Sequence, residues 1–358
     1  MNRNQLQKGD RAVFLKNGSE YISGLIRRGL DDGTNTAAVR GRYEIASAVR
    51  LPSDFTLVLD GCHLKMASGV FDNMFVNEGL GTGRENKNIH LLGRNGAVLD
   101  GGEYNGLSER NSGRDGMPPI WKNNLILCAN VKGFEMGGFA CVDQRWWAMN
   151  FLFCSQGHLH DISFTSNDIL LEPDGSHSHG LVRDRYGDIL VKNSDGIDLR
   201  QGCRDILIEN ITGFTEDDSV ALTGLQGRLE QEFAVPGAET DICRITIKNV
   251  ATAAFCSNVR LLNQGGIKLH DILIDGITDT SGTCPHMDVG IHALRIGDTH
   301  MYGSRHATAD ETYNIRVKNI YSRAAVSAVA LAGEMTNVEI DPPLCAPGTV
   351  DVTDNRGR

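Results

Sequence analysis

The chain has 358 residues and a formal net charge of −10, so its overall field would repel nucleic acids and anionic membrane surfaces. No segment reaches the roughly 18 consecutive apolar residues of a membrane span. We therefore expect neither a nucleic acid nor a membrane as a partner. With 41 Gly, only 9 Pro and no low-complexity linker, the composition favours one solenoid domain over two or three compact domains, because a solenoid core grows coil by coil.

The N-terminal part, residues 1–60, is expected to form a cap and the first turns of this solenoid. Residues 41–45 and 51–59 are short segments in which apolar and polar residues alternate, as in strands. A cap is needed because an open solenoid end exposes apolar core and unpaired strand edges. The first residues lack the apolar run of a secretory signal. This favours a cytoplasmic protein; secretion after removal of a signal is the alternative.

One short pattern recurs along the rest of the chain: a polar residue, an alternating apolar strand, and an Asn or Gly turn. Alternate Ile and Val residues give each copy one inward face, which is the two-residue period of a strand. No segment of roughly 12 or more residues keeps a helical period. Many copies are separated by about 20 to 27 residues, a spacing typical of solenoid repeats. The copies begin at Asn88, Asp161, Asp188, Asp205, Arg244, Asp271, Asn314 and Asn337.

This repeat predicts the fold. Parallel strands that are joined by short connections can pair if the chain always coils in one direction. A doubly wound sheet would instead need crossover helices that the sequence lacks. We predict an all-β protein, a right-handed single-stranded parallel β-helix, with one domain over residues 1–358 and a C-terminal tail at residues 341–358. The nine cysteines form no C-x-x-C pair and are expected to be free thiols. Asparagines that end strands suit left-handed turns and could stack: Asn193, Asn210, Asn249 and Asn319.

Several residues in the middle of the chain are candidates for binding a sugar. Trp147 could stack on a sugar ring. His158, His160, His177 and His179 form two His-x-His pairs about one coil apart, and residues two apart in a strand share a face. A metal site is conceivable there, but no nearby Cys or Glu completes a convincing ligand set. We therefore expect no metal and no cofactor, and assign His158 and His179 to sugar hydroxyls in a cleft.

Two neighbouring coils carry acidic motifs. Asp195 lies in the first, and Asp217 and Asp218 lie in the second, about one coil later. Since neighbouring strands lie ~4.8 Å apart, we expect these carboxylates to stack on one face of the solenoid. Their repulsion raises the pKa of at least one and leaves another ionised. Glycoside hydrolysis requires such a pair, with an acid for the leaving oxygen and a base for water.

These motifs resemble those of the polygalacturonase-like glycoside hydrolases of family 28. The Asn-Ser-Asp that ends at Asp195 resembles the family's Asn-Thr-Asp motif, and Asp217 with Asp218 resembles its acidic pair. The resemblance covers roughly residues 40 to 340 and implies an inverting hydrolase. It implies that Asp217 is the general acid, that Asp195 and Asp218 activate the water, and that Asn193 contacts the substrate.

Two further motifs of that family are missing. The chain has residues 254–260 where a Gly-His-Gly is expected, and residues 290–296 where an Arg-Ile-Lys is expected. Arg260, His292 and Arg295 are the candidates to replace the missing cations, because a guanidinium can hold a carboxylate in a bidentate fork. The predicted substrate is a poly- or oligosaccharide, uronate-containing and pectin-like ones included. Its sugar and linkage stay open.

Two other classes of function also stay open. A β-helix uronan lyase or epimerase, or a glycan transferase, would use the same carboxylates. A non-catalytic glycan-binding spike protein would keep its ligand after loss of Asp217. The sequence does not indicate an oligomeric state.

Overall fold

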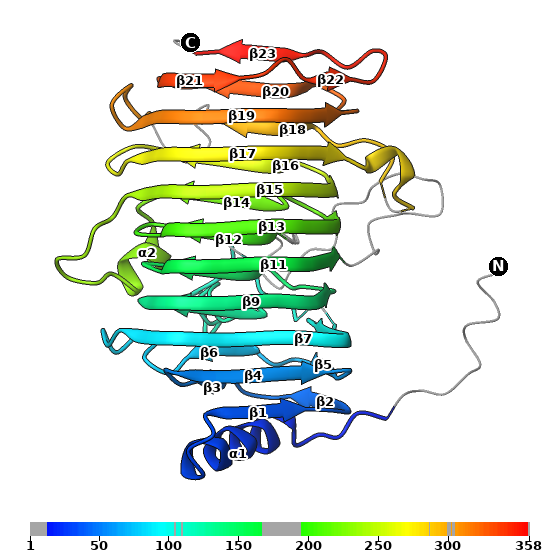
Figure 1. Cartoon of the computed structure of the whole chain (residues 1–358), viewed down its shortest axis with the longest axis vertical. Coiled ribbons are helices and arrows are strands. Elements are labelled where there is room, and N and C mark those ends of the chain that lie inside the picture. Colours follow the sequence, from blue (N-terminus) through cyan, green and yellow to red (C-terminus); the bar gives the residue numbers. More distant parts are fainter. Residues whose placement is uncertain are drawn as a thin grey trace.

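The computed structural model describes residues 13–356 apart from 104, 109, 167–194, 286, 299–301 and 303–304. In this part of the chain the strands stack in parallel, rung upon rung, into two long sheets (Figure 1). The protein is a right-handed single-stranded parallel β-helix, as predicted. Asn193 and His179, both predicted to contact substrate, lie outside the described residues.

The described residues form two sheets that run the length of the solenoid, with a few short helices. Sheet A has thirteen strands: β1 (Thr36–Val39), β2 (Arg42–Ile45), β4 (Phe55–Asp60), β5 (His63–Met66), β7 (Asn86–Asp100), β9 (Val131–Val142), β11 (Ser155–Thr165), β13 (Arg204–Thr215), β15 (Ile242–Ala254), β17 (Leu269–Asp279), β19 (Thr312–Ser322), β21 (Thr336–Ile340) and β22 (Leu344–Cys345). Sheet B has ten: β3 (Val49–Leu51), β6 (Phe75–Asn77), β8 (Ile126–Ala129), β10 (Trp147–Leu152), β12 (Asp195–Arg200), β14 (Val220–Gly224), β16 (Ser257–Asn263), β18 (His292–Ile296), β20 (Ser327–Ala332) and β23 (Val352–Asn355). The helices are α1 (Gly18–Asp31), α2 (Arg228–Glu232) and a 3-10 turn (Ser281–Thr283). None of the described helices is long and apolar enough to cross a membrane.

The repeat places equivalent apolar residues directly above one another. In sheet A, Ile206 pairs with Ile245 and Ile245 with Ile272, which pairs in turn with Ile315. All four side chains are buried. Burying a side chain of this size stabilises the fold by roughly 1.5–3 kcal/mol, so each rung contributes its own share of the core. The nine cysteines are free thiols, as predicted.

Left-handed residues begin and bend the strands of sheet A. The first residue of each described copy of the repeat has a φ between 51° and 58°; apart from Arg244 these residues are Asn or Asp, which tolerate this conformation better than most. Asn210, Asn249 and Asn319 are left-handed too. Asn249 Nδ2 donates to Asn210 Oδ1 at 3.1 Å, so these two residues stack, whereas Asn319 donates to Asp275.

Helix α1 covers the N-terminal end of the solenoid (Figure 1). Ile22 and Ile26 are buried beneath the first strands. Gly29 permits the close approach of this helix to β1, because a Cβ at residue 29 would lie 2.6 Å from the carbonyl oxygen of Thr36. The cap expected within residues 1–60 is therefore a helix of 14 residues, which contradicts the expectation that no segment keeps a helical period.

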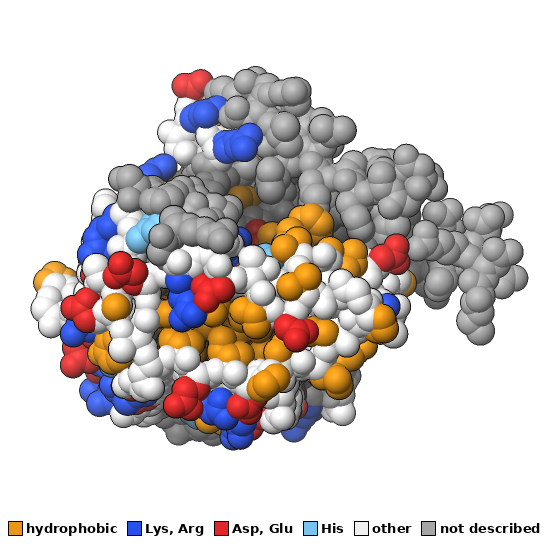
Figure 2. Space-filling model, turned by 90° about the horizontal axis from the view of Figure 1, so that it is seen from above, with side chains coloured by type: hydrophobic (Ala, Val, Ile, Leu, Met, Phe, Trp, Pro, Cys, Tyr) orange, Lys and Arg blue, Asp and Glu red, His pale blue; other side chains and the backbone are white. Residues whose placement is uncertain are grey.

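The described residues of the predicted C-terminal tail, 341–356, form more than a tail. They supply β22, which pairs with β19, and β23, which pairs with β20, so they extend both sheets. Figure 2 shows this end of the molecule, where hydrophobic side chains reach the surface. Leu344 and Val350 are 70% and 53% exposed. Among the described residues, no helix covers this last rung as α1 covers the first.

Candidate active site

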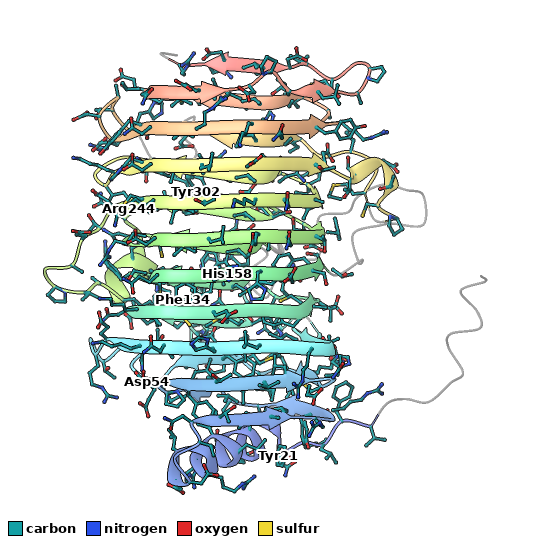
Figure 3. The ribbon with its side chains drawn as sticks, in the orientation of Figure 1. Tyr21, Asp54, Phe134, His158, Arg244 and Tyr302 are labelled. Carbon is teal, nitrogen blue, oxygen red and sulfur yellow. The ribbon has the colours of Figure 1, made fainter. Side chains whose placement is uncertain are left out.

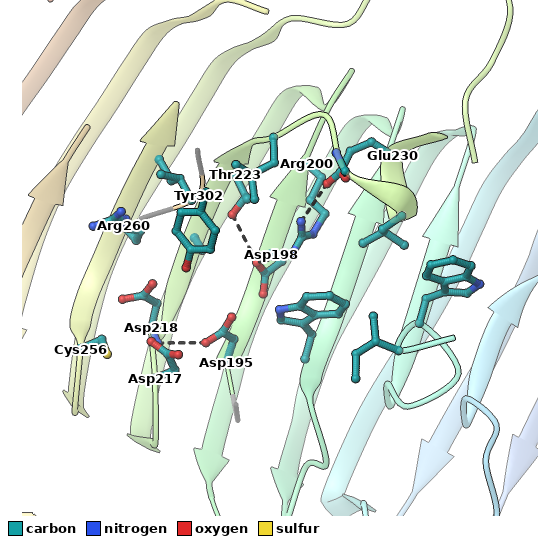
Figure 4. A pocket seen from close by; sticks show the side chains of 18 of the residues that line it. Asp195, Asp198, Arg200, Asp217, Asp218, Thr223, Glu230, Cys256, Arg260 and Tyr302 are labelled. Atoms are coloured by element: carbon teal, nitrogen blue, oxygen red, sulfur yellow. Dashed lines mark hydrogen bonds and ion pairs between the residues drawn. The ribbon is translucent and has the colours of Figure 1, made fainter. Parts of the chain in front are cut away.

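A cavity of about 400 Å³ opens on the outer face of sheet B (Figure 4). Its floor comes from β12, β14, β16 and β18, and one wall comes from the loop that contains α2. This volume lies within the ~300–1,000 Å³ typical of ligand sites. The residues that line it include Trp121, Trp147, Asp195, Asp198, Arg200, Asp217, Asp218, Thr223, Glu230, Cys256, Arg260, Arg295 and Tyr302.

The structure brings the three predicted catalytic residues together at one end of this cavity. One carboxylate oxygen from each of Asp195, Asp217 and Asp218 lies within 4.8 Å of the others. The N–H of Asp218 donates to Asp195 Oδ1 at 3.1 Å (Figure 4). Because Ile197 pairs with Val220, the register aligns Asp195 with Asp218, not with Asp217 as the one-coil spacing had indicated.

Burial and repulsion from neighbouring carboxylates, Asp198 among them, raise the pKa of all three carboxyl groups. Desolvation is the largest cause for each. The charges of Asp217 and its neighbours add to it, so the pKa of Asp195 lies well above its usual range and that of Asp218 rises to about 7. Carboxyl groups this close do not all ionise together, and the cluster retains a proton near neutral pH. It therefore contains both an acid and a base.

This desolvation predicts that Asp195→Asn stabilises the protein at alkaline pH. The pKa of Asp195 is raised above its ordinary 3.8 in the folded state, so its ionisation costs stability as the pH rises through the folded-state pKa. The neutral amide avoids this cost. We expect the variant to melt at a higher temperature than the wild type near about pH 8, with the difference shrinking toward zero near about pH 3.5. Circular dichroism melting curves measure the melting temperatures of the variant and the wild type at each pH. A lower melting temperature of the variant at the alkaline pH would contradict the expectation.

Asp198 and Arg200 extend the polar floor along β12, and the sequence analysis assigned neither of them. Ile197 and Leu199 enter the core, so the alternating residues face the cavity. Arg200 Nη1 donates to Glu230 Oε1 on α2 at 2.8 Å, and its Nη2 lies 3.6 Å from Asp198. The buried ion pair between Arg200 and Glu230 holds the loop that contains α2 against the floor of the cavity. Burial also raises the pKa of Asp198 to about 7.

Trp147 and Tyr302 are aromatic residues that line the cavity. Trp147 lies on the rung before Asp195 and pairs with it. It lines the cavity, as its predicted role of stacking on a sugar ring requires. The residue is only 7% exposed, however, and the Arg200 guanidinium lies 4.3 Å from the ring centroid. One face of the ring therefore supports Arg200. Tyr302, from the loop after β18, reaches over the cavity (Figure 4), and no pattern in the sequence distinguished it from other loop residues.

Arg260 and Arg295 stand on neighbouring rungs of the floor, where they pair with each other. Arg260 also pairs with Ala221, which pairs with Asp198. This column of paired positions therefore runs from an acidic to a basic residue across the floor of the cavity. Burial and the positive charge of Arg260 lower the pKa of Arg295. Two guanidinium groups beside the carboxylates can hold an anionic group of a ligand. The structure thus places both predicted arginines in the cavity.

The other two predicted histidines lie elsewhere. His292 begins β18 beside the cavity, with Nδ1 3.2 Å from the carbonyl oxygen of Ser327, and it is not among the described residues that line the cavity. His158 lies in β11 of sheet A (Figure 3), with Nε2 2.9 Å from Glu209 Oε1. The prediction that His158 contacts substrate in this cleft is wrong, because a side chain on the outer face of sheet A points away from sheet B.

Comparisons with known proteins give a likeness in structure alone. No family model and no curated protein sequence matches the chain. A mutant tailspike protein of E. coli bacteriophage HK620, solved in complex with a hexasaccharide, superposes with a TM-score of 0.57 at 11% identity, over 96% of this chain and 62% of that one. This chain thus spans less than two thirds of the tailspike. A 1,3-alpha-1,4-beta-D-galactose-4-sulfate-3,6-anhydro-D-galactose-2-sulfate 4 galactohydrolase gives 0.57 at 12% identity, over 96% and 88%. At such identities the likeness shows a common fold, the parallel β-helix.

Proposed function

We propose that the chain is a glycoside hydrolase that cleaves a poly- or oligosaccharide at Asp195, Asp217 and Asp218. The observation that carries this proposal is the cluster itself: three carboxyl groups within 4.8 Å of one another, with raised pKa values, in the wall of a cavity. An acid and a base in one cleft are what hydrolysis of a glycosidic bond needs. The fold shared with a tailspike bound to a hexasaccharide and with a galactohydrolase supports carbohydrate as the ligand class.

In the proposed reaction Asp217 is the general acid, and Asp195 with Asp218 holds the attacking water. The hydrogen bond from the Asp218 N–H keeps the latter two side by side. The water oxygen forms a bond to the anomeric carbon while its proton passes to the carboxylate that holds it. The bond to the leaving oxygen breaks, and that oxygen takes the proton of Asp217. The resemblance to family 28 supports this assignment of roles.

A single displacement of this kind inverts the configuration at the anomeric carbon. Carboxyl groups only about 5–5.5 Å apart are more usual in retaining enzymes, in which one of them attacks the sugar. Two carboxylates that share one water can sit closer than an isolated acid and base, so we expect inversion. Proton NMR of the first product measures its anomeric signal; early accumulation of the retained anomer would favour a covalent glycosyl-enzyme intermediate.

The substrate class is proposed from the two arginines. Arg260 and Arg295 lie beside the acidic cluster, where they would bind the carboxylate or sulfate of an anionic sugar. Release of reducing sugar across a panel of uronate-containing, sulfated and neutral glycans tests both the activity and this preference. No release from any of them would contradict the hydrolase. Products that absorb in the ultraviolet, formed only without a chelator, would instead identify a lyase.

A further inference from the structure

Outside the cavity, three potential metal ligands meet on the outer face of sheet A. One ligand atom from each of Glu135, His158 and His160 lies within 4.8 Å of the others. His158 and His160 are two residues apart in β11 and so share a face. Glu135 on β9 is the direct partner of His158. Figure 3 shows His158 on this sheet, which does not carry the acidic cluster.

Each of the two imidazoles is held by a further carboxylate. His160 Nδ1 lies 2.8 Å from Asp161 Oδ2, and His158 Nε2 lies 2.9 Å from Glu209 Oε1. A carboxylate only accepts hydrogen bonds, so neutral His158 carries its proton on Nε2; both nitrogens of His160 face carboxylates, and the neutral ring carries its proton on Nδ1, which makes the shorter of the two contacts. The lone pairs then fall on His160 Nε2 and His158 Nδ1. Carboxylates arranged in this way commonly orient the histidines that bind zinc.

The lone pair of His160 faces another acceptor. His160 Nε2 lies 3.3 Å from Glu135 Oε1, and it is enclosed without a hydrogen bond to any described residue. Two acceptors at this distance repel each other unless a cation or a proton lies between them. Tetrahedral zinc binds its ligands at about 2.0–2.2 Å and so holds them roughly 3.3 Å apart. The second oxygen of Glu135 lies 3.2 Å from His90 Nδ1, which orients the carboxylate.

We propose that Glu135, His158 and His160 bind a divalent transition metal, with zinc as the best match to two imidazoles and one carboxylate. Asp161 and Glu209 add negative charge around the three ligands, which favours a cation. Bound metal would join β9 to β11 and stabilise these two rungs. The sequence made a metal at His158 and His160 conceivable but did not support it, because the carboxylate that completes the set, Glu135, comes from the preceding rung.

Isothermal titration of the reduced, chelator-treated full chain with zinc chloride tests the site. We expect one equivalent to bind with a Kd below about 10 µM, and His160→Gln and His158→Gln to weaken binding at least ~100-fold. The matched control is His270→Gln. His270 also bonds a following left-handed aspartate, Asp271, at 2.8 Å, but its ring stacks on Tyr313 instead of a second histidine. This control is expected to bind zinc like the wild type.

Two further measurements separate this site from the others that could hold a cation. Zinc is expected to raise the melting temperature of the wild type and of His270→Gln but not of His160→Gln, whose metal-free melting temperature shows whether it folds. Asp217→Asn is expected to keep its zinc affinity, because it alters only the acidic cluster. No binding at submillimolar zinc, equal binding by His160→Gln and His270→Gln, or loss of zinc only in Asp217→Asn would each overturn the proposal.

Discussion

Replacing Asp217 by asparagine is expected to lower kcat by at least ~10³-fold, since loss of general-acid assistance typically costs 10²–10⁴-fold and this residue also belongs to the cluster that positions water. Asp195→Asn and Asp218→Asn should lower kcat comparably, because each would hold the attacking water. Initial rates on a glycan that the panel identifies as substrate measure the effect. Circular dichroism establishes that each variant retains the fold of the wild type.

A carboxylate elsewhere on the same rungs provides the control. Asp205 is exposed at the start of β13 in sheet A, where it bonds Arg244, so Asp205→Asn is expected to leave kcat unchanged. Near-normal turnover in all three cluster variants would show that the catalytic assignment is wrong. A wild type that binds the glycan without cleaving it would favour the non-catalytic spike protein, and Asp217→Asn would then keep its affinity.

The fold could be predicted because apolar and polar residues alternate within each copy of its repeat. The isoleucines of the repeat, such as Ile206 and Ile245, became stacked core positions. The N-terminal helix was missed although Ile22, Leu25 and Ile26 recur at helical spacing and pack toward the core, because the small residues Ser19 and Gly29 complete the buried stripe and Leu30 lies exposed outside it. This mixture weakens a helical period in the sequence, while packing against the first rung compensates for it.

The site could be predicted only where rung spacing determines it. The same alternation that identified the strand at Asp195 also directs Asp198 and Arg200 into the cavity, so that signal was present and was not used. Glu230 and Tyr302 come from loops whose path no periodicity encodes. His158 was misplaced for a related reason: spacing gives the rung of a residue but not which of the two sheets carries it.

Breaking the ion pair between Arg200 and Glu230 is expected to have the largest effect on stability. Their side chains are only 6% and 3% exposed, and the 2.8 Å bond joins α2 to β12. Glu230→Gln would leave the guanidinium charge buried, with Asp198 at 3.6 Å as a more distant counter-charge. Loss of one partner of a buried pair destabilises by about 3–5 kcal/mol, so we expect a loss of about 3 kcal/mol in the free energy of unfolding.

Urea denaturation of the variants tests this value, with Glu232→Gln as control because Glu232 lies on the same helix and is exposed. That control is expected to change stability by less than about 0.5 kcal/mol. Replacing both partners, as Arg200→Met with Glu230→Met, should restore part of the loss, because the guanidinium charge is removed with its partner; Asp198, whose pKa is already raised to about 7, then takes up a proton instead of remaining as an unpaired charge. If Glu230→Gln were as stable as Glu232→Gln, the pair would not hold the α2 loop. Where the loop is released, the cavity loses the wall that contains Leu229, so KM should rise more than kcat falls.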